Sequence, residues 1–216
     1  MDVNAFVLAQ LPPPPARVLE VGCGGGELAQ ALDAAGYDVL AIDPRAPAGA
    51  LFRTVTLEEL EEPGPFDAAV AVRVLHHVDP LGPAVAKLAR LAPLLVLDEF
   101  APERLDAVAQ DWYDGQRRVL AATGADPGGP EDLDEWRAAH SDLHPSAVVL
   151  AAVRAAFEER LLTWEPYLYR WLTDPASESH ERALVETGAL PALGYRWAGT
   201  APASGCARGT RAGRRA

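Results

Sequence analysis

The feature that most constrains the fold is a glycine-rich run near the N-terminus. It reads Glu20-Val21-Gly22-Cys23-Gly24-Gly25-Gly26-Glu27. The run follows a short apolar segment, 17–21, that is typical of a buried strand, and it precedes apolar residues at helical spacing, 27–35. Glycines at such a junction allow a tight turn and let the backbone approach a ligand closely, because no Cβ intervenes. We therefore expect a strand, a turn and a helix, with a flat or slender ligand against the turn.

The residues around the glycines restrict the kind of ligand. A dinucleotide fingerprint needs a further glycine where this chain has Glu27, and that carboxylate would repel a pyrophosphate at the start of the helix. A P-loop is excluded because no Gly-Lys-Ser or Gly-Lys-Thr follows the run. Asp43 ends the next strand-like segment, about 20 residues later, where a carboxylate can accept hydrogen bonds from both hydroxyls of a ribose. Together these features favour a nucleoside without a pyrophosphate. The alternative is a permissive turn, with Asp43 serving only the Asp43-Pro44 turn.

Segments typical of strands and helices alternate through the first half of the chain. Strands are expected at 17–21, 38–42, 53–55, 66–72 and 94–98. Helices are expected at 3–11, 27–35 and 80–91, the last with Asp79 as N-cap and Pro80 at its first position. This order predicts an α/β fold in which a Rossmann-like, doubly wound, mostly parallel sheet carries helices on both faces.

The second half of the chain is richer in helix. Helices are expected at 102–122 and 146–156, a strand at 158–164, and a last strand at 194–198 that forms an antiparallel edge. The helical material is too large for a plain crossover, so we expect a helical insertion or cap after the fifth strand, within about 101–157. One domain, 1–200, would then precede a flexible arginine-rich tail, 201–216, that holds Arg208, Arg211, Arg214 and Arg215.

The first hundred residues or so resemble the class I methyltransferases, which depend on S-adenosylmethionine (SAM). The resemblance rests on residues 18–26, similar to the segment that opens the cofactor site in that family, and on 66–78, similar to its fourth strand and the Leu-His-His-Val that follows. The later half looks similar to small actinobacterial-type members whose acceptors are unassigned. The resemblance implies that SAM is the cofactor and that the chain is a transferase.

The resemblance also assigns roles to individual residues. It implies that Gly22, Gly24 and Gly26 line the methionine end of SAM, that Asp43 holds the ribose, and that Arg73 and Val74 pass beneath the cofactor. Glu20 would orient the loop or meet the methionine ammonium. The family often has an Asp or Asn near the adenine, whereas this chain has Leu57 and Glu58 there. The expected cofactor set is Glu20, Gly22, Cys23, Gly24, Gly26, Asp43, Pro44, Leu57, Glu58, Arg73 and Val74.

The acceptor is expected beyond the carboxyl ends of the strands, close to the first and fourth. His77 follows the fourth strand and Glu99 leaves the fifth, so both are candidate catalytic residues, and His144 is a candidate base. Each also has a plain structural interpretation, as a solvated or backbone-bonded histidine or as a carboxylate beside a helix N-terminus. No metal site is expected, because a third ligand is missing near His140 and His144. Several aromatic residues could line an acceptor pocket or pack in the core: Trp112, Tyr113, Trp136, Tyr167 and Tyr169.

Composition narrows the partners. The formal net charge of −12 disfavours nucleic acid, which attracts basic surfaces, and no apolar stretch approaches the length of a membrane span. The N-terminus lacks the pattern of a secretory signal, so we expect a cytoplasmic protein, either a monomer or a homodimer. The leading hypothesis is a SAM-dependent methyltransferase that acts on a small-molecule acceptor by in-line transfer. The alternatives are an RNA or protein methyltransferase and a catalytically inactive SAM-binding scaffold.

Overall fold

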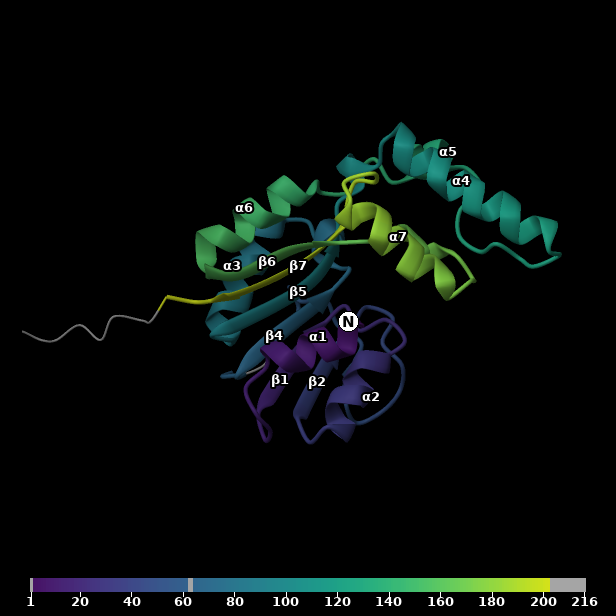
Figure 1. Ribbon diagram of the computed structural model, residues 1–216. Helices are drawn as coiled ribbons and strands as arrows, with labels where there is room; N and C mark the ends of the chain where they lie inside the picture. Colours follow the sequence, from purple (N-terminus) through teal and green to yellow (C-terminus); the bar gives the residue numbers. More distant parts are fainter. Residues whose placement is uncertain (1, 62–63, 203–216) are drawn as a thin grey trace, which may run out of the picture.

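The computed structural model describes residues 2–61 and 64–202 and shows one seven-stranded sheet with helices on both faces (Figure 1). The strand order is β3-β2-β1-β4-β5-β7-β6. The parallel half consists of β1 (Arg17–Val21), β2 (Asp38–Ile42), β3 (Phe52–Arg53), β4 (Ala68–Val72) and β5 (Leu94–Phe100). The Rossmann-like, mostly parallel sheet expected from the sequence is therefore confirmed.

The antiparallel strand does not lie at the edge of the sheet. β7 (Gly194–Thr200) pairs antiparallel with β5 on one side and with β6 (Glu158–Glu165) on the other. The expectation that 194–198 forms the edge is wrong, because β6 occupies that place. The reason is visible in the residues: β7 is almost entirely buried, whereas β6 begins with the exposed Glu158-Glu159-Arg160, and charged residues suit an edge strand.

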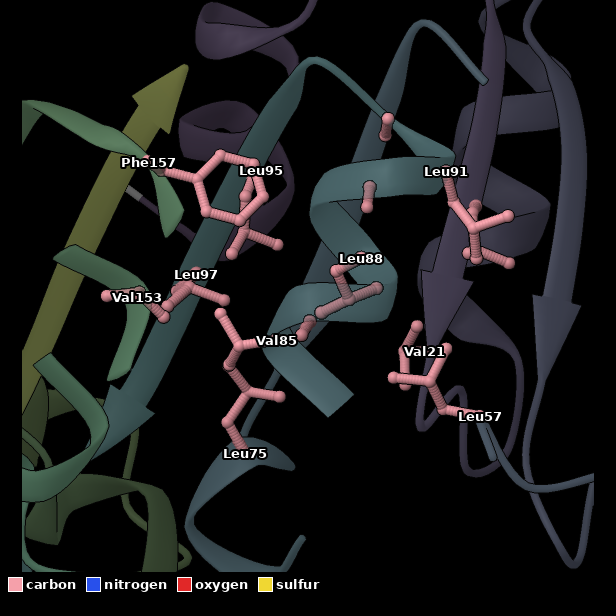
Figure 2. Close-up of a cluster of buried hydrophobic side chains, with 14 of the residues drawn as sticks. Val21, Leu57, Leu75, Val85, Leu88, Leu91, Leu95, Leu97, Val153 and Phe157 are labelled. Atoms are coloured by element: carbon pink, nitrogen blue, oxygen red, sulfur yellow. The ribbon is translucent and has the colours of Figure 1, made fainter. Parts of the chain in front are cut away.

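Two apolar layers separate the sheet from its helices. One layer packs β-strand side chains against α3 (Leu81–Leu91) and α6 (Ser146–Ala156), and side chains such as Leu88, Leu97 and Val153 meet there (Figure 2). The other layer lies under α1 (Val3–Gln10) and α2 (Glu27–Ala34), with Phe6 and Leu32 at its centre. Both faces of the parallel strands are thus covered, as their near-continuous apolar sequences require.

The helical segment after β5 divides into parts with different positions. A short 3₁₀ turn, η2 (Pro102–Arg104), is separated from α4 (Ala107–Ala122) by Leu105 and Asp106, so the continuous helix expected at 102–122 is wrong. Asp106 breaks it by capping α4, since its side chain accepts the Ala109 N–H. α4 and α5 (Leu133–Ala139) project beyond the sheet (Figure 1), whereas α6 packs against α3. The division into a domain with a cap stays a prediction.

Other boundaries differ by a few residues. α3 begins at Leu81, and Pro80 is its N-cap residue. The expectation that Asp79 caps this helix is therefore wrong. β3 is limited to two residues, and Val55 lies outside it. The last helix, α7 (Ala176–Glu186), follows the 3₁₀ turn η3 (Leu168–Trp171). Residues 203–216 of the expected tail lie outside the described residues.

The packing of α6 on the sheet gives a direct stability prediction. Val153 is fully buried between α6 and the strands, while Val148 on the same helix is 44% exposed. We expect Val153→Ala to lower the free energy of unfolding by about 1.5–3 kcal/mol, because it removes two buried methyl groups and leaves a cavity. Val148→Ala is the matched control and should change it by less than about 0.5 kcal/mol. Chemical denaturation measures both, and equal effects would show that α6 does not belong to the core.

Candidate active site

The glycine run forms a loop whose glycines serve different purposes. Gly22 has φ +73°, and a Cβ there would collide with the side chain of Val74, so this glycine allows the loops after β1 and β4 to touch. Gly24 has φ +50° and open space where a Cβ would project. Gly26 has φ +88° and faces the ring of Phe52. Gly22 and Gly24 therefore face the space expected for a ligand, whereas Gly26 starts α2 and packs against the chain.

A cavity of about 920 Å³ lies over this loop at the carboxyl ends of β1, β2 and β4. Its volume falls within the range of about 300–1,000 Å³ that is usual for small-molecule sites. Glu20, Cys23 and Gly26 do not line it, so the expectation that these three touch a cofactor has no support in the geometry. The other residues expected to bind the cofactor do line it: Gly22, Gly24, Asp43, Pro44, Leu57, Glu58, Arg73 and Val74.

Asp43 connects the glycine loop to the end of β2. Its Oδ2 accepts the Gly24 N–H at 3.1 Å, and its Oδ1 accepts the Arg45 N–H at 2.7 Å. The carboxylate also lines the cavity. Each of its oxygens has a second lone pair, so the group can hold the loop and still accept hydrogen bonds from a ligand.

Glu20 lies behind the loop, and only 3% of it is exposed. Its Oε2 has no hydrogen-bond partner within the described structure. Burial raises the pKa of this carboxyl to about 8, and the neighbouring carboxylates Glu27 and Asp43 add to the shift. Near neutral pH this carboxyl is therefore mostly protonated in the folded protein.

The chain after β4 is fixed by one buried carboxylate, Glu99 at the end of β5. Arg73 has the unusual φ of +57°, and its N–H donates to the Asp98 carbonyl at 2.7 Å. Oε1 of Glu99 then accepts the N–H groups of Val74 at 3.0 Å and Leu75 at 2.6 Å. Glu99 is fully buried and lines neither cavity. This carboxylate therefore points inward and holds the loop, and the catalytic role expected of Glu99 stays a prediction.

A second, smaller cavity of about 320 Å³ also borders this loop. Arg73 and His77 line both cavities and so mark where the two meet. His77 was expected at the acceptor, and its position is consistent with that role. Burial lowers the pKa of His77, and the adjacent His76 lowers it further. The lining is rich in aromatic rings and imidazoles: Val72, Arg73, His76, His77, Phe100, Trp136, His140, Leu143, Tyr167 and Trp171.

The far wall of the second cavity is held by another buried carboxylate, Glu181 of α7. Its oxygens accept the N–H groups of Tyr167 at 2.8 Å, Leu168 at 3.0 Å and Tyr169 at 2.7 Å, at the start of η3. The ring of Tyr167 stacks on Phe100 with centroids 4.2 Å apart. Rotation of this wall would leave the buried carboxylate and three N–H groups without partners, so its aromatic side chains are held in place.

His144 lies outside both cavities. Its backbone N–H donates to the His76 carbonyl at 2.9 Å, and its Nε2–H donates to the Val78 carbonyl at 3.0 Å. His144 therefore ties the start of α6 to η1 (Leu75–His77), and this geometry gives no support to the expectation that it acts as a base. Phe100 and Trp171 also line the second cavity, and the sequence had not indicated either as a site residue. The pairing of His76 with a buried carboxylate depends on how β5 faces, and no short motif shows this.

Neither a membrane-spanning helix nor a metal centre is found among the residues that the structure describes. No helix there has the length and apolar character needed to span a bilayer. At no point of the same residues do three His, Cys, Asp or Glu side chains gather in a way that would hold a metal ion.

The raised pKa of Glu20 predicts a specific pH dependence of stability. Between pH 4.5 and about 8 the folded protein binds more protons than the unfolded chain, so stability falls as pH rises through this window. Glu20→Gln cannot ionise and should escape this loss. Thermal unfolding across the window should therefore show the melting temperature of the variant rising relative to wild type as pH increases. Burying the new amide in the variant also changes stability, but by the same amount at every pH. It therefore does not affect how the difference in melting temperature varies with pH.

The exposed Glu186 at the end of α7 offers the matched control. Glu186→Gln should leave the pH profile of the melting temperature unchanged. If Glu20→Gln also kept a constant difference from wild type at all pH values, the buried carboxyl would not be protonated in the folded protein.

Comparisons with known proteins show the family and the fold of this chain. A model of the methyltransferase domain family matches residues 2–160. A ubiquinone biosynthesis O-methyltransferase of Xanthomonas campestris is 40% identical over 92 residues, and this match covers 35% of the chain but only 38% of the relative. One of the same name from Rhodopseudomonas palustris is 27% identical over 190 residues, 79% of the chain and 70% of the relative.

Among solved structures, a SAM-dependent methyltransferase from Mesorhizobium loti shares the fold. It aligns over 91% of this chain and 96% of its own, with a TM-score of 0.57 and 17% identity. The fold, the cavity over the glycine loop and the family match lead to one conclusion: the chain belongs to the methyltransferase domain family, the class I enzymes that depend on S-adenosylmethionine.

Proposed function

We propose that this enzyme transfers the methyl group of SAM to a small planar aromatic acceptor. The observation that carries the proposal is the meeting of two cavities at Arg73 and His77. One is large enough for a nucleoside with an amino-acid arm, and the other is smaller and lined by aromatic rings. Methyl transfer in line requires the two reactants to approach from opposite sides of the methyl carbon, which two adjoining cavities allow.

The first cavity suits SAM on three counts. Asp43 offers acceptor lone pairs for the ribose hydroxyls, Gly24 leaves the loop open to close approach, and the volume of about 920 Å³ accommodates a nucleoside with an amino-acid arm. Leu57 and Glu58 form the wall where the adenine would lie. When bound, SAM supplies a methyl group on a cationic sulfur. The protein's part is to orient it and to exclude water.

The second cavity favours a flat ring. Trp136, Tyr167 and Trp171 give it aromatic walls, and the ring of His140 stacks on Trp136 with centroids 4.4 Å apart. Aromatic walls bind rings by offset stacking and edge contacts. The name of the relatives, ubiquinone biosynthesis O-methyltransferase, supports oxygen as the methylated atom. The net charge of −12 argues against RNA as the acceptor.

Cofactor binding tests the first cavity. Asp43→Asn should weaken the binding of S-adenosylhomocysteine (SAH) roughly 10- to 100-fold, because hydrogen bonds to a charged group are worth about 1.5–3 kcal/mol. Isothermal titration calorimetry measures the affinity. Asp38→Asn, at the opposite end of the same strand, is the control and should bind SAH as wild type does. Unchanged affinity in Asp43→Asn would remove the ribose from this position.

Acceptor binding tests the second cavity and separates an enzyme from an inactive scaffold. Radiolabelled methyl transfer to a panel of phenols and catechols should show turnover by wild type, whereas transfer RNA should accept no label.

Trp136→Leu should raise the acceptor KM about tenfold, the equivalent of about 1.4 kcal/mol of lost stacking, and leave SAH affinity unchanged.

Trp164→Leu is the matched control for this substitution. Trp164 is 37% exposed beneath Arg104 and lines neither cavity, so its loss should change neither constant. If Trp136→Leu weakened SAH and not the acceptor, the roles of the two cavities would be wrongly assigned.

A further inference from the structure

We propose that His76 removes a proton from a hydroxyl of the acceptor, and that Glu99 positions His76 for this step. This inference rests on the proposed function and deepens it, since it assigns a base and requires an acceptor with an acidic O–H, such as a phenol. The pair consists of a buried carboxylate at the end of β5 and an imidazole in the 3₁₀ turn after β4.

The geometry fixes which ring nitrogen faces the acceptor. Nδ1 of His76 donates to Oε2 of Glu99 at 2.5 Å. The ring itself lines the second cavity. Its other nitrogen, Nε2, has no hydrogen-bond partner among the described residues and is not among their buried unpartnered atoms. A proton held on Nδ1 by the carboxylate leaves Nε2 with a lone pair, which is the arrangement that a general base needs.

Glu99 does more than select this form of the ring. Its Oε1 is held by the N–H groups of Val74 and Leu75, so the carboxylate cannot rotate away from the histidine. When Nε2 takes up a proton, the ring becomes a cation beside a fixed negative charge, which stabilises it in a water-poor environment. Glu99 is thus a positioning residue, and His76 is the group that touches the acceptor.

Two other histidines line the same cavity and are weaker candidates. His77 has no side-chain hydrogen bond in the described structure, and both burial and His76 disfavour its protonation. Nδ1 of His140 donates to the Trp136 carbonyl at 2.7 Å. The partner of His140 is therefore a neutral oxygen, whereas the partner of His76 is a carboxylate. His76 also adjoins His77, with ring centroids 4.3 Å apart, at the point where the two cavities meet.

The proposed step balances in atoms and electrons. The O–H bond of the acceptor breaks, and its proton passes to Nε2 of His76. The oxygen lone pair forms a bond to the methyl carbon, while the carbon–sulfur bond breaks and leaves its electron pair on sulfur. The products are the methyl ether, neutral SAH and a protonated His76, which later returns the proton to water.

The groups that face His76 set the conditions for testing this step by pH. They are Glu99 from β5, His77 beside it, Arg73 before η1, His140 at the end of α5 and Tyr167 before η3. Tyr167 does not compete as a base, because burial raises its pKa to about 12. A pH profile with one acceptor cannot separate the two other histidines from His76, so the test compares acceptors of different acidity.

The experiment uses His76→Gln with 4-methylphenol, which holds its proton at about pH 8.5, and with 4-nitrophenol, which is ionised there. Loss of a general base should lower kcat for 4-methylphenol about 10²- to 10⁴-fold, and kcat for 4-nitrophenol by much less, because that acceptor needs no base. For 4-methylphenol, the pH at which kcat rises should also be higher in His76→Gln than in wild type. Without the base, the rate depends on ionisation of the phenol itself.

A spectroscopic measurement supplies a readout independent of turnover. In the SAH complex of wild type, the absorbance of 4-nitrophenolate should develop at a lower pH than in His76→Gln. Glu99→Gln is the second variant: its amide would donate toward Nδ1 and place the proton on Nε2, so it should show the same dependence on acceptor acidity. His180→Gln, an exposed histidine of α7, is the control and should behave as wild type.

The outcomes separate this proposal from the one it rests on. If wild type binds SAH but methylates no phenol, the acceptor class is wrong and both proposals fall. If wild type methylates both phenols while His76→Gln loses the same factor with each, or loses nothing, only the role of this pair is overturned. Selective loss with 4-methylphenol supports it.

Discussion

The site depends on one interaction, the hydrogen bonds that the buried Glu99 accepts from the chain after β4. They hold the N–H groups of Val74 and Leu75 and the ring of His76 at the end of the neighbouring strand. A carboxylate buried without partners is very costly, so folding requires all of these contacts together. The loop that they fix is the wall between the two cavities. The position of one side chain therefore sets the boundary between the two cavities.

The two cavities arise from different parts of the fold. The larger one is made at the carboxyl ends of parallel strands, the usual place for a ligand in such sheets, and consecutive segments supply it. The smaller one needs segments that are far apart in the sequence, from β4 to η3, together with the helices that project beyond the sheet. Glu181 plays there the part that Glu99 plays at the wall, because it fixes a turn whose aromatic rings line the space.

Local features were predictable and distant ones were not. The strand, glycine loop and helix of residues 17–35, and the carboxylate of Asp43 beside them, follow from short motifs whose physical requirements are local. The positive φ of Gly26 serves the start of α2 and contact with Phe52, and a glycine motif does not distinguish this purpose from ligand binding. Register and packing across the sheet determine three other features: the direction of Glu99, the place of His144 and the interior position of β7. A short segment of sequence carries no information about such distant contacts.

A crystal structure with SAH and 4-methylphenol bound together is the most direct test of two adjoining cavities with separate occupants. The account predicts the ribose beside Asp43, and the phenol ring among Trp136, Tyr167 and Trp171 with its hydroxyl toward Nε2 of His76. A phenol found along α3 near Lys87, or SAH lying among the aromatic rings, would contradict it.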